Sequence, residues 1–186
     1  MVQTNCYWNR DQRYYSTSPW RGSLDQDGGV LYTQFSHFVD LIYWVFGDIQ
    51  QPKSIIRNLT HHDLKDFDDS GFIQFEFVSG GIGSINYSTS CWDTNMESSI
   101  TVMGTKGCVK IGGQYMNEVE YCHVENYELP ELAPTNPPND YGPYKGSAAN
   151  HHYVFQNVID VLIGQTEITA TAYEGLKVVQ MIERIY

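Results

Sequence analysis

The sequence predicts an α+β fold: a mostly antiparallel, open-faced β-sheet with helices packed on one of its faces. Two pairs of alternating segments, each joined by a glycine-containing turn, predict hairpins over residues 70–90 and 97–113. Residues 27–47 and two segments after residue 150 instead repeat their apolar residues at helical spacing. Because the helices can cover only one face of the sheet, the other face is expected to be solvated or buried in a partner.

The chain opens with residues 2–10, which alternate loosely, are rich in β-forming residues and predict a strand that ends near Arg10. A strand at the very first residue is typical of a domain from a longer chain. Residues 11–26 contain many turn formers and predict a loop that presents Trp20 and Arg21 ahead of the central helix.

The central helix is expected over residues 27–47, between an Asp-Gly-Gly turn and a glycine suited to the left-handed position that ends a helix. At about 100° per residue, Thr33, His37 and Asp40 would fall on one face of it. An imidazole between a hydroxyl and a carboxylate is either a satisfied core histidine or a working acid/base. A lone histidine favours the first interpretation, whereas three polar residues on one face favour the second.

The middle of the chain predicts five or six further strands, most of them linked as hairpins. Pro52 blocks more helix after the central one, and the segment at 91–95 interrupts the sheet pattern. The strands are expected at residues 53–60, 70–79, 81–90, 97–104, 107–113 and, at an edge, 116–129. Residues 61–69 are expected to form a charged turn or loop.

The last third predicts a long loop and two helices. Residues 126–149 hold five of the seven prolines and predict an irregular loop of the kind that is usually functional or mobile. Asn150 can cap the first helix, and a capping box that starts at Thr171 opens the second. The expected apolar stripe consists of Phe155, Val158, Ile159, Leu162, Leu176, Val179, Ile182 and Ile185.

Composition narrows the functional class. The 186 residues suffice for one well-packed domain, and 22 acidic against 11 basic residues argue against nucleic acid or an anionic membrane as a partner. No apolar run is long enough to span a membrane, and no secretory signal opens the chain. Four scattered cysteines without a CxxC pair favour reduced thiols, and we expect a cytoplasmic protein.

Familiar catalytic and cofactor motifs are missing: the sequence has no GxGxxG, Walker, GxSxG or HExxH pattern. The glycine pairs at 80–81 and 112–113 are interpreted as turns, because no helix opens after either. Histidine pairs at 61–62 and 151–152 invite a metal interpretation, but neither has a third ligand at convincing spacing. No metal site is therefore predicted.

Several segments resemble the C-terminal domain of the Gfo/Idh/MocA oxidoreductase family. DGGVLYTQFSHFVDLIYWVFGD resembles its first helix, and YWNRDQRYY resembles the strand that ends in its arginine-containing motif. DDSGFIQFEFVSGGIGSINYSTS is similar to its paired strands, ESSITVMGTKGCVKIGG to its hairpin and ITATAYEGLKVVQMIERIY to its closing helix. The order and spacing of these segments, over nearly the whole chain, carry the resemblance more than any single motif.

The resemblance implies a dehydrogenase of sugars or cyclitols that uses NAD or NADP. In such enzymes a Rossmann domain binds most of the cofactor. We therefore expect residues 1–186 to be a single C-terminal domain, with the Rossmann domain absent from this chain and the isolated domain inactive.

The resemblance also implies roles for single residues. His37 matches the family's catalytic histidine and would move the hydroxyl proton. Thr33 stands where many members have an aspartate, which points to a subfamily acting on nucleotide-linked or modified sugars. Asp40 matches a recurrent aspartate with an orienting or structural role. Substrate-binding roles fall on Thr33, Trp8, Arg10, Trp20, Arg21, Trp92 and Asn95, and only Arg10 could also reach the cofactor.

Two interpretations follow. The first is the substrate-binding half of an NAD(P)-dependent dehydrogenase or reductase acting on a sugar, a nucleotide-sugar or a cyclitol, assembled as a homodimer or homotetramer through the sheet. The second is a non-catalytic domain for ligand binding or sheet-mediated assembly. Both expect a small sugar-like ligand and neither nucleic acid nor membrane.

Overall fold

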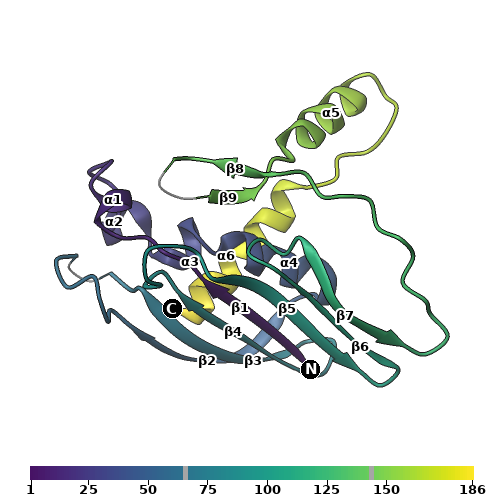
Figure 1. Ribbon diagram of the computed structural model, residues 1–186, viewed down its shortest axis with the longest axis horizontal. Coiled ribbons are helices and arrows are strands. Elements are labelled where there is room, and N and C mark those ends of the chain that lie inside the picture. Colours follow the sequence, from purple (N-terminus) through teal and green to yellow (C-terminus); the bar gives the residue numbers. More distant parts are fainter. Residues whose placement is uncertain (65–66, 143–144) are drawn as a thin grey trace.

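The computed structural model describes residues 1–64, 67–142 and 145–186 and has an α+β fold (Figure 1). Its main sheet has seven strands in the order β2-β3-β4-β1-β5-β6-β7. Neighbouring strands are antiparallel except β1 and β4, which pair in parallel. The strands are β1 Val2–Tyr7, β2 Ile49–Arg57, β3 Ser70–Phe77, β4 Ile82–Ser88, β5 Glu97–Gly104, β6 Gly107–Gly112 and β7 Glu118–Val124.

The two predicted hairpins are confirmed, and so is the edge position of the last main strand, β7. In β3 the residues alternate between buried and exposed, and Ile73 pairs with Ile85 of β4 in the core. Gly80 and Gly81 both have positive φ in the turn between these strands, a conformation that glycine adopts without steric cost.

One face of the sheet is covered by α4 (Ser36–Phe46) and α6 (Ala172–Ile185), which pack against each other (Figure 1). The predicted capping box of α6 is confirmed: the Thr171 hydroxyl accepts from Glu174 N at 3.2 Å. The α6 stripe is shifted from its predicted position, because Leu176 and Val179 are exposed. The core residues of these two helices are Phe38, Val39, Ile42, Val178, Met181, Ile182 and Ile185.

The prediction of one helix over residues 27–47 is wrong. The segment contains α3 (Val30–Thr33) and α4, preceded by the short α1 (Gln12–Tyr15) and α2 (Leu24–Asp27). At the break, Phe35 N bonds Val30 O, five residues back, at 2.9 Å. The buried Gln34 side chain donates to the Tyr14 hydroxyl at 2.8 Å, a contact that an uninterrupted helix would not favour.

Strand β2 begins at Ile49, four residues earlier than predicted. Pro52 lies inside it, at a bulge between Gln50 and Lys53 where Gln51 has a φ of 51°. Proline is tolerated there because β2 is an edge strand and the bulge removes the need for its missing N–H.

The C-terminal third differs most from the prediction. The loop expected over residues 126–149 contains a small sheet of β8 (Pro138–Asp140) and β9 (Lys145–Ala148). Helix α5 (His151–Leu162) projects from the body (Figure 1), and its predicted apolar stripe is exposed. Asn150 does not cap it: its side chain accepts from Asn136 instead, at 2.7 Å. Residues 65–66 and 143–144, within the predicted loops 61–69 and 126–149, lie outside the described residues.

Two predictions made from composition can be compared with the structure. Across the described ranges, no helix combines the length and the apolar character that a membrane crossing requires. All four cysteines are free thiols, and Cys6 is buried.

Candidate functional site

His37 lies in the first turn of α4, at the surface, and lines two cavities. The smaller, of about 360 Å³, also borders Trp44 and the start of α6. The larger, of about 630 Å³, is shared with Tyr115 and the start of α5. Although His37 is exposed, the protein atoms around its ring partly desolvate it and lower its pKa below the usual 6.5, and the Asp40 carboxylate only partly opposes this effect. A neutral imidazole that opens onto a cavity can accept a proton.

The predicted polar face is only partly formed. Asp40 lines the smaller cavity together with His37. Thr33 precedes the helix break, and its hydroxyl lies 2.9 Å from the Asp27 carboxylate and 3.3 Å from Gly29 O, both of which can accept its proton. The structure therefore brings His37 and Asp40 together and directs Thr33 toward the preceding turn.

Arg10 lies just after β1 and is only 5% exposed. Its guanidinium packs over the rings of Trp8, at 4.8 Å, and Tyr14, at 5.4 Å, and donates to Asn95 Oδ1 at 3.1 Å. Trp8 belongs to the core, where its indole N–H donates to Ser98 Oγ at 2.8 Å. Trp8 is thus a support for Arg10 rather than an exposed contact surface.

Asn95 is buried and joins several segments. Besides Arg10, its Oδ1 accepts from Asn9 N at 2.9 Å, and its Nδ2 donates to Lys145 O in β9 at 3.2 Å. Its own carbonyl accepts from Gln114 Nε2 at 2.8 Å. Asn95 therefore fixes the β4–β5 connection to the loop after β1, to the turn after β6 and to the small sheet.

Arg21 and Trp20 extend the group around Arg10. The Arg21 guanidinium lies 4.2 Å from the ring centre of Tyr14 and 5.4 Å from that of Trp20, which is partly exposed. Two guanidinium groups, those of Arg10 and Arg21, thus contact one tyrosine. Because Gln34 holds the hydroxyl of the same tyrosine, this cluster is connected to the break just before α4.

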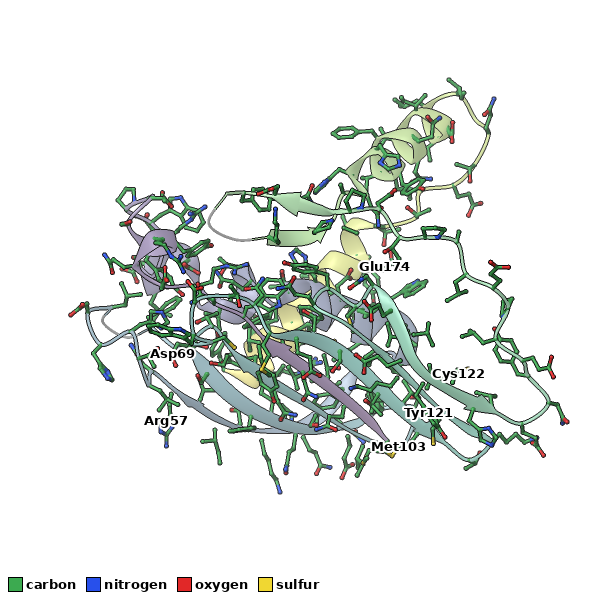
Figure 2. All side chains as sticks on the ribbon, viewed as in Figure 1. Arg57, Asp69, Met103, Tyr121, Cys122 and Glu174 are labelled. Carbon is green, nitrogen blue, oxygen red and sulfur yellow. The ribbon has the colours of Figure 1, made fainter. Side chains whose placement is uncertain are left out.

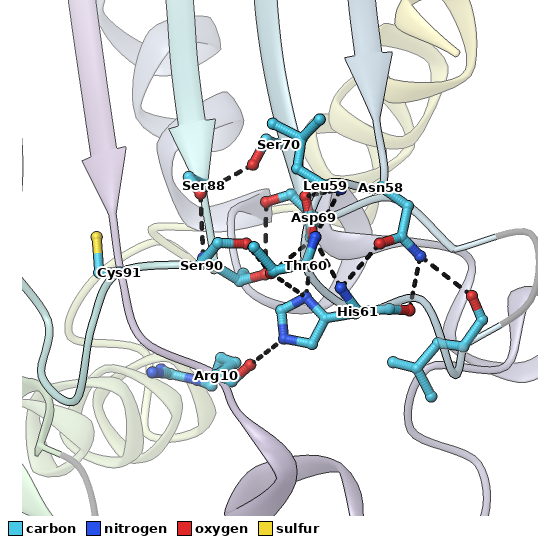
Figure 3. A network of polar contacts seen from close by, with 12 residues as sticks. Arg10, Asn58, Leu59, Thr60, His61, Asp69, Ser70, Ser88, Ser90 and Cys91 are labelled. Carbon is cyan, nitrogen blue, oxygen red and sulfur yellow. Dashed lines mark hydrogen bonds and ion pairs between the residues drawn. The ribbon is translucent and has the colours of Figure 1, made fainter.

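A polar network that sequence reasoning missed lies beside Arg10 (Figure 3). The Asp69 side chain is fully buried and accepts hydrogen bonds from the backbone N–H groups of Leu59, at 3.0 Å, and Thr60, at 2.8 Å. It also contacts His61 Nδ1 at 3.0 Å. His61 Nε2 lies 2.6 Å from Arg10 O and donates to it, since a carbonyl can only accept.

This network stabilises the negative charge of the buried Asp69 carboxylate. Burial alone would raise the pKa of Asp69, but the hydrogen bonds from His61, Leu59 and Thr60 outweigh it and hold that pKa well below its usual range. The sequence contained a signal for this network. The segment between β2 and β3 connects two paired strands, so its first and last residues must lie close together. From the sequence, His61 is a candidate only for metal binding, as part of the pair 61–62. Among the described residues, no three His, Cys, Asp or Glu side chains form a metal-binding group.

The Gly28-Gly29 turn does not form a phosphate-binding loop. The one glycine pair that precedes a helix, at 28–29, opens the four-residue α3, whose first turn is already occupied. The Tyr186 hydroxyl accepts from Leu31 N at 3.2 Å and donates to Asp68 at 3.0 Å. The Leu31 N–H is therefore not available to a phosphate.

Solved structures of oxidoreductases share this fold. The WlbA dehydrogenase from Bordetella pertussis, in complex with NADH and UDP-GlcNAcA, is 29% identical with a TM-score of 0.81. The WlbA dehydrogenase from Chromobacterium violaceum, in complex with the same molecules, is 27% identical with a TM-score of 0.82. Each match covers 100% of this chain and 51% of the other. An oxidoreductase from Thermotoga maritima, 18% identical with a TM-score of 0.70, covers 99% and 50% and shows the fold alone.

The chain thus spans about half the length of the solved structures that it matches. No curated protein matches it. The family model of the GFO/IDH/MocA C-terminal domain matches residues 1–110, which is more than half of the sequence. The chain therefore belongs to the GFO/IDH/MocA family of oxidoreductases, of which it contains the C-terminal domain.

Proposed function

We propose that this chain is the substrate-binding half of an NAD(P)-dependent dehydrogenase that acts on a nucleotide-linked sugar. Among sugars, nucleotide-sugars and cyclitols, the nucleotide-sugar is favoured because the two relatives of 27–29% identity are dehydrogenases in complex with NADH and UDP-GlcNAcA. The dinucleotide is held by a nucleotide-binding domain outside residues 1–186. We call the polypeptide that carries both parts the full-length protein.

The observation that carries the proposal is His37, an imidazole of lowered pKa that lines two cavities. A hydroxyl that is oxidised must lose its proton, and His37 accepts that proton in its neutral form. Asp40 lines the smaller cavity with His37 and has an orienting or structural role. Trp20 and Arg21 line neither cavity at His37, and their aromatic and cationic surface suits a more distant, acidic part of the substrate.

The direct test is turnover. The full-length protein is incubated with UDP-GlcNAcA and either NAD or NADP, and reduction of the nicotinamide is followed by absorbance. We expect reduction that depends on the nucleotide-sugar. No reduction with any nucleotide-sugar, from a folded protein that binds the dinucleotide, would favour the alternative of a ligand-binding or assembly domain.

The sheet face opposite the helices supports assembly through the sheet. Ile55 and Phe72 are directly paired across β2 and β3, both 62% exposed, and Ile82 of β4 is 56% exposed. Figure 2 shows further side chains projecting from this side, among them Met103 and Tyr121. On the same face, Gln74, Ser84 and Asn86 lie between Phe72 and Ile82. Exposed apolar groups with polar neighbours are typical of interfaces, and we propose a homodimer or homotetramer formed through this open face.

Changing Phe72 to Arg should shift the chain from a dimer or larger assembly toward monomer, because a charge would be buried at the centre of the interface. Light scattering coupled to gel filtration measures the mass. Tyr127→Arg, at another exposed aromatic beyond β7, is the matched control and should leave the mass unchanged. If the unmodified chain is monomeric at high concentration, the sheet-mediated assembly is wrong.

A further inference from the structure

We propose that a third cavity, separate from the two at His37, is a binding subsite for the nucleoside part of the substrate. This Trp92 cavity has a volume of about 520 Å³ and is lined by segments 9–13, 60–64 and 89–93. The inference rests on the proposed function, because it divides one nucleotide-linked sugar between two places. The sugar lies at His37, and the base lies against Trp92.

The Trp92 cavity lies beyond the carboxyl ends of three strands of the main sheet. β1 and β4 are parallel, and β2 runs in the same direction because it is antiparallel to β3, which is antiparallel to β4. The carboxyl ends of β1, β2 and β4 therefore lie at the same end of the sheet, and each strand is followed by a segment that lines the cavity. Loops that a rigid sheet positions in this way commonly bind ligands.

The Trp92 side chain is the most exposed large apolar group of the described part of the chain, at 94%. Its loop is nevertheless held firmly. Arg13 donates to Asp93 O at 3.1 Å, and Asn9 Nδ2 donates to Cys91 O at 2.7 Å. A fixed loop that keeps an indole in water offers a flat stacking surface at little entropic cost. A nucleobase is a planar ring that fits such a surface.

The charges of the Trp92 cavity favour a neutral ring over a phosphate. Arg13 is paired with Asp11 at 2.7 Å and with Asp93 at 3.3 Å, so its charge is compensated. Asp63 adds a further carboxylate to the lining. With Arg10 included, three carboxylates face two guanidinium groups, so the lining favours the neutral base over the diphosphate of a nucleotide-sugar.

The floor of the Trp92 cavity is rigid and borders the site at His37. Arg10 and His61 line the cavity, and the buried Asp69 fixes His61 from below (Figure 3). The Arg10 guanidinium also bonds Asn95. The same guanidinium packs over Trp8, whose ring contacts those of Phe35, at 5.3 Å, and Phe38, at 5.8 Å, on either side of His37 in the chain. The two sites are thus linked through Trp8, and a ligand that occupies both must be elongated, as a nucleotide-linked sugar is.

The test measures binding of UDP to the full-length protein by calorimetry. Trp92→Ala should weaken UDP binding by about 10–100-fold, the loss expected for one stacked base, and Trp92→Phe should restore most of the affinity. Trp92→Ala should also raise KM for UDP-GlcNAcA and leave kcat nearly unchanged, since the reacting sugar stays at His37. Tyr127→Ala, at an exposed aromatic outside all three cavities, should change none of these values.

Unchanged UDP affinity in Trp92→Ala, with turnover intact, would overturn the subsite and leave the proposed function standing. A change in the mass of the assembly without a change in UDP affinity would also overturn it, because Trp92 would then contact a protein. Conversely, UDP binding that depends on Trp92 in a protein without dehydrogenase activity would support the subsite and refute the proposed function.

Discussion

Replacing His37 with alanine in the full-length protein is expected to lower kcat by about 10²–10⁴-fold, the usual loss when a general acid/base is removed. Affinity for UDP should change little, because the nucleoside binds elsewhere in this account. Steady-state kinetics with UDP-GlcNAcA measure the first quantity and calorimetry the second. The matched control is His62→Ala, at an exposed histidine in the loop after β2.

The pH dependence of kcat gives an independent check on His37. The pKa of His37 is lowered from 6.5 by partial desolvation, so the neutral form that accepts a proton persists below the usual range of histidine. The rate of oxidation should therefore fall on the acid side of pH 6.5 and stay level just above it. An acid limb centred above pH 7, or near-normal turnover in His37→Ala, would show that another group moves the proton.

Replacing Asp69 with alanine is expected to destabilise the chain by about 3–5 kcal/mol, the range for removing one member of a buried, hydrogen-bonded pair. The variant leaves the Leu59 and Thr60 N–H groups without their acceptor and removes the contact with His61 Nδ1. Urea unfolding followed by tryptophan fluorescence measures the free energy. Asp63→Ala, at an exposed carboxylate of the same connection, should cost much less.

The stabilisation by Asp69 has a defined pH window. Its pKa in the folded chain is held below the unfolded value of 3.8, so the carboxylate contributes fully above pH 3.8 and its contribution is lost as the pH falls further. The free energy of unfolding of the unmodified chain should therefore drop below about pH 4 more steeply than that of Asp69→Asn. Equal slopes, or a loss below about 1 kcal/mol in Asp69→Ala, would contradict the role of this network.

The sheet could be predicted from the sequence because its signals are local. Alternation in β3, the glycine pair at 80–81 and the capping box at Thr171 each depend on residues close together in the chain. The break before α4 could not be predicted: the buried Gln34 at the break finds its hydrogen-bond partner, Tyr14, twenty residues away in the chain. The shared face of Thr33 and His37 was wrong because it assumed a continuous helix.

The candidate site likewise contains residues that the sequence points to and contacts that only the three-dimensional fold reveals. Resemblance singled out His37, Arg10 and Trp92, but only the fold shows that Trp92 lines a different cavity from His37. His61 was set aside because its partner Asp69 and its acceptor, the carbonyl of Arg10, come from other segments. Pairings of this kind depend on strand register, which composition and periodicity do not give.

A crystal structure of the full-length protein with dinucleotide and UDP-GlcNAcA tests the central claim most directly. We predict one sugar hydroxyl within about 2.6–3.2 Å of a ring nitrogen of His37, the reach of direct proton transfer. A complex in which the sugar is bound and no sugar hydroxyl lies within reach of His37, directly or through one water, would contradict it.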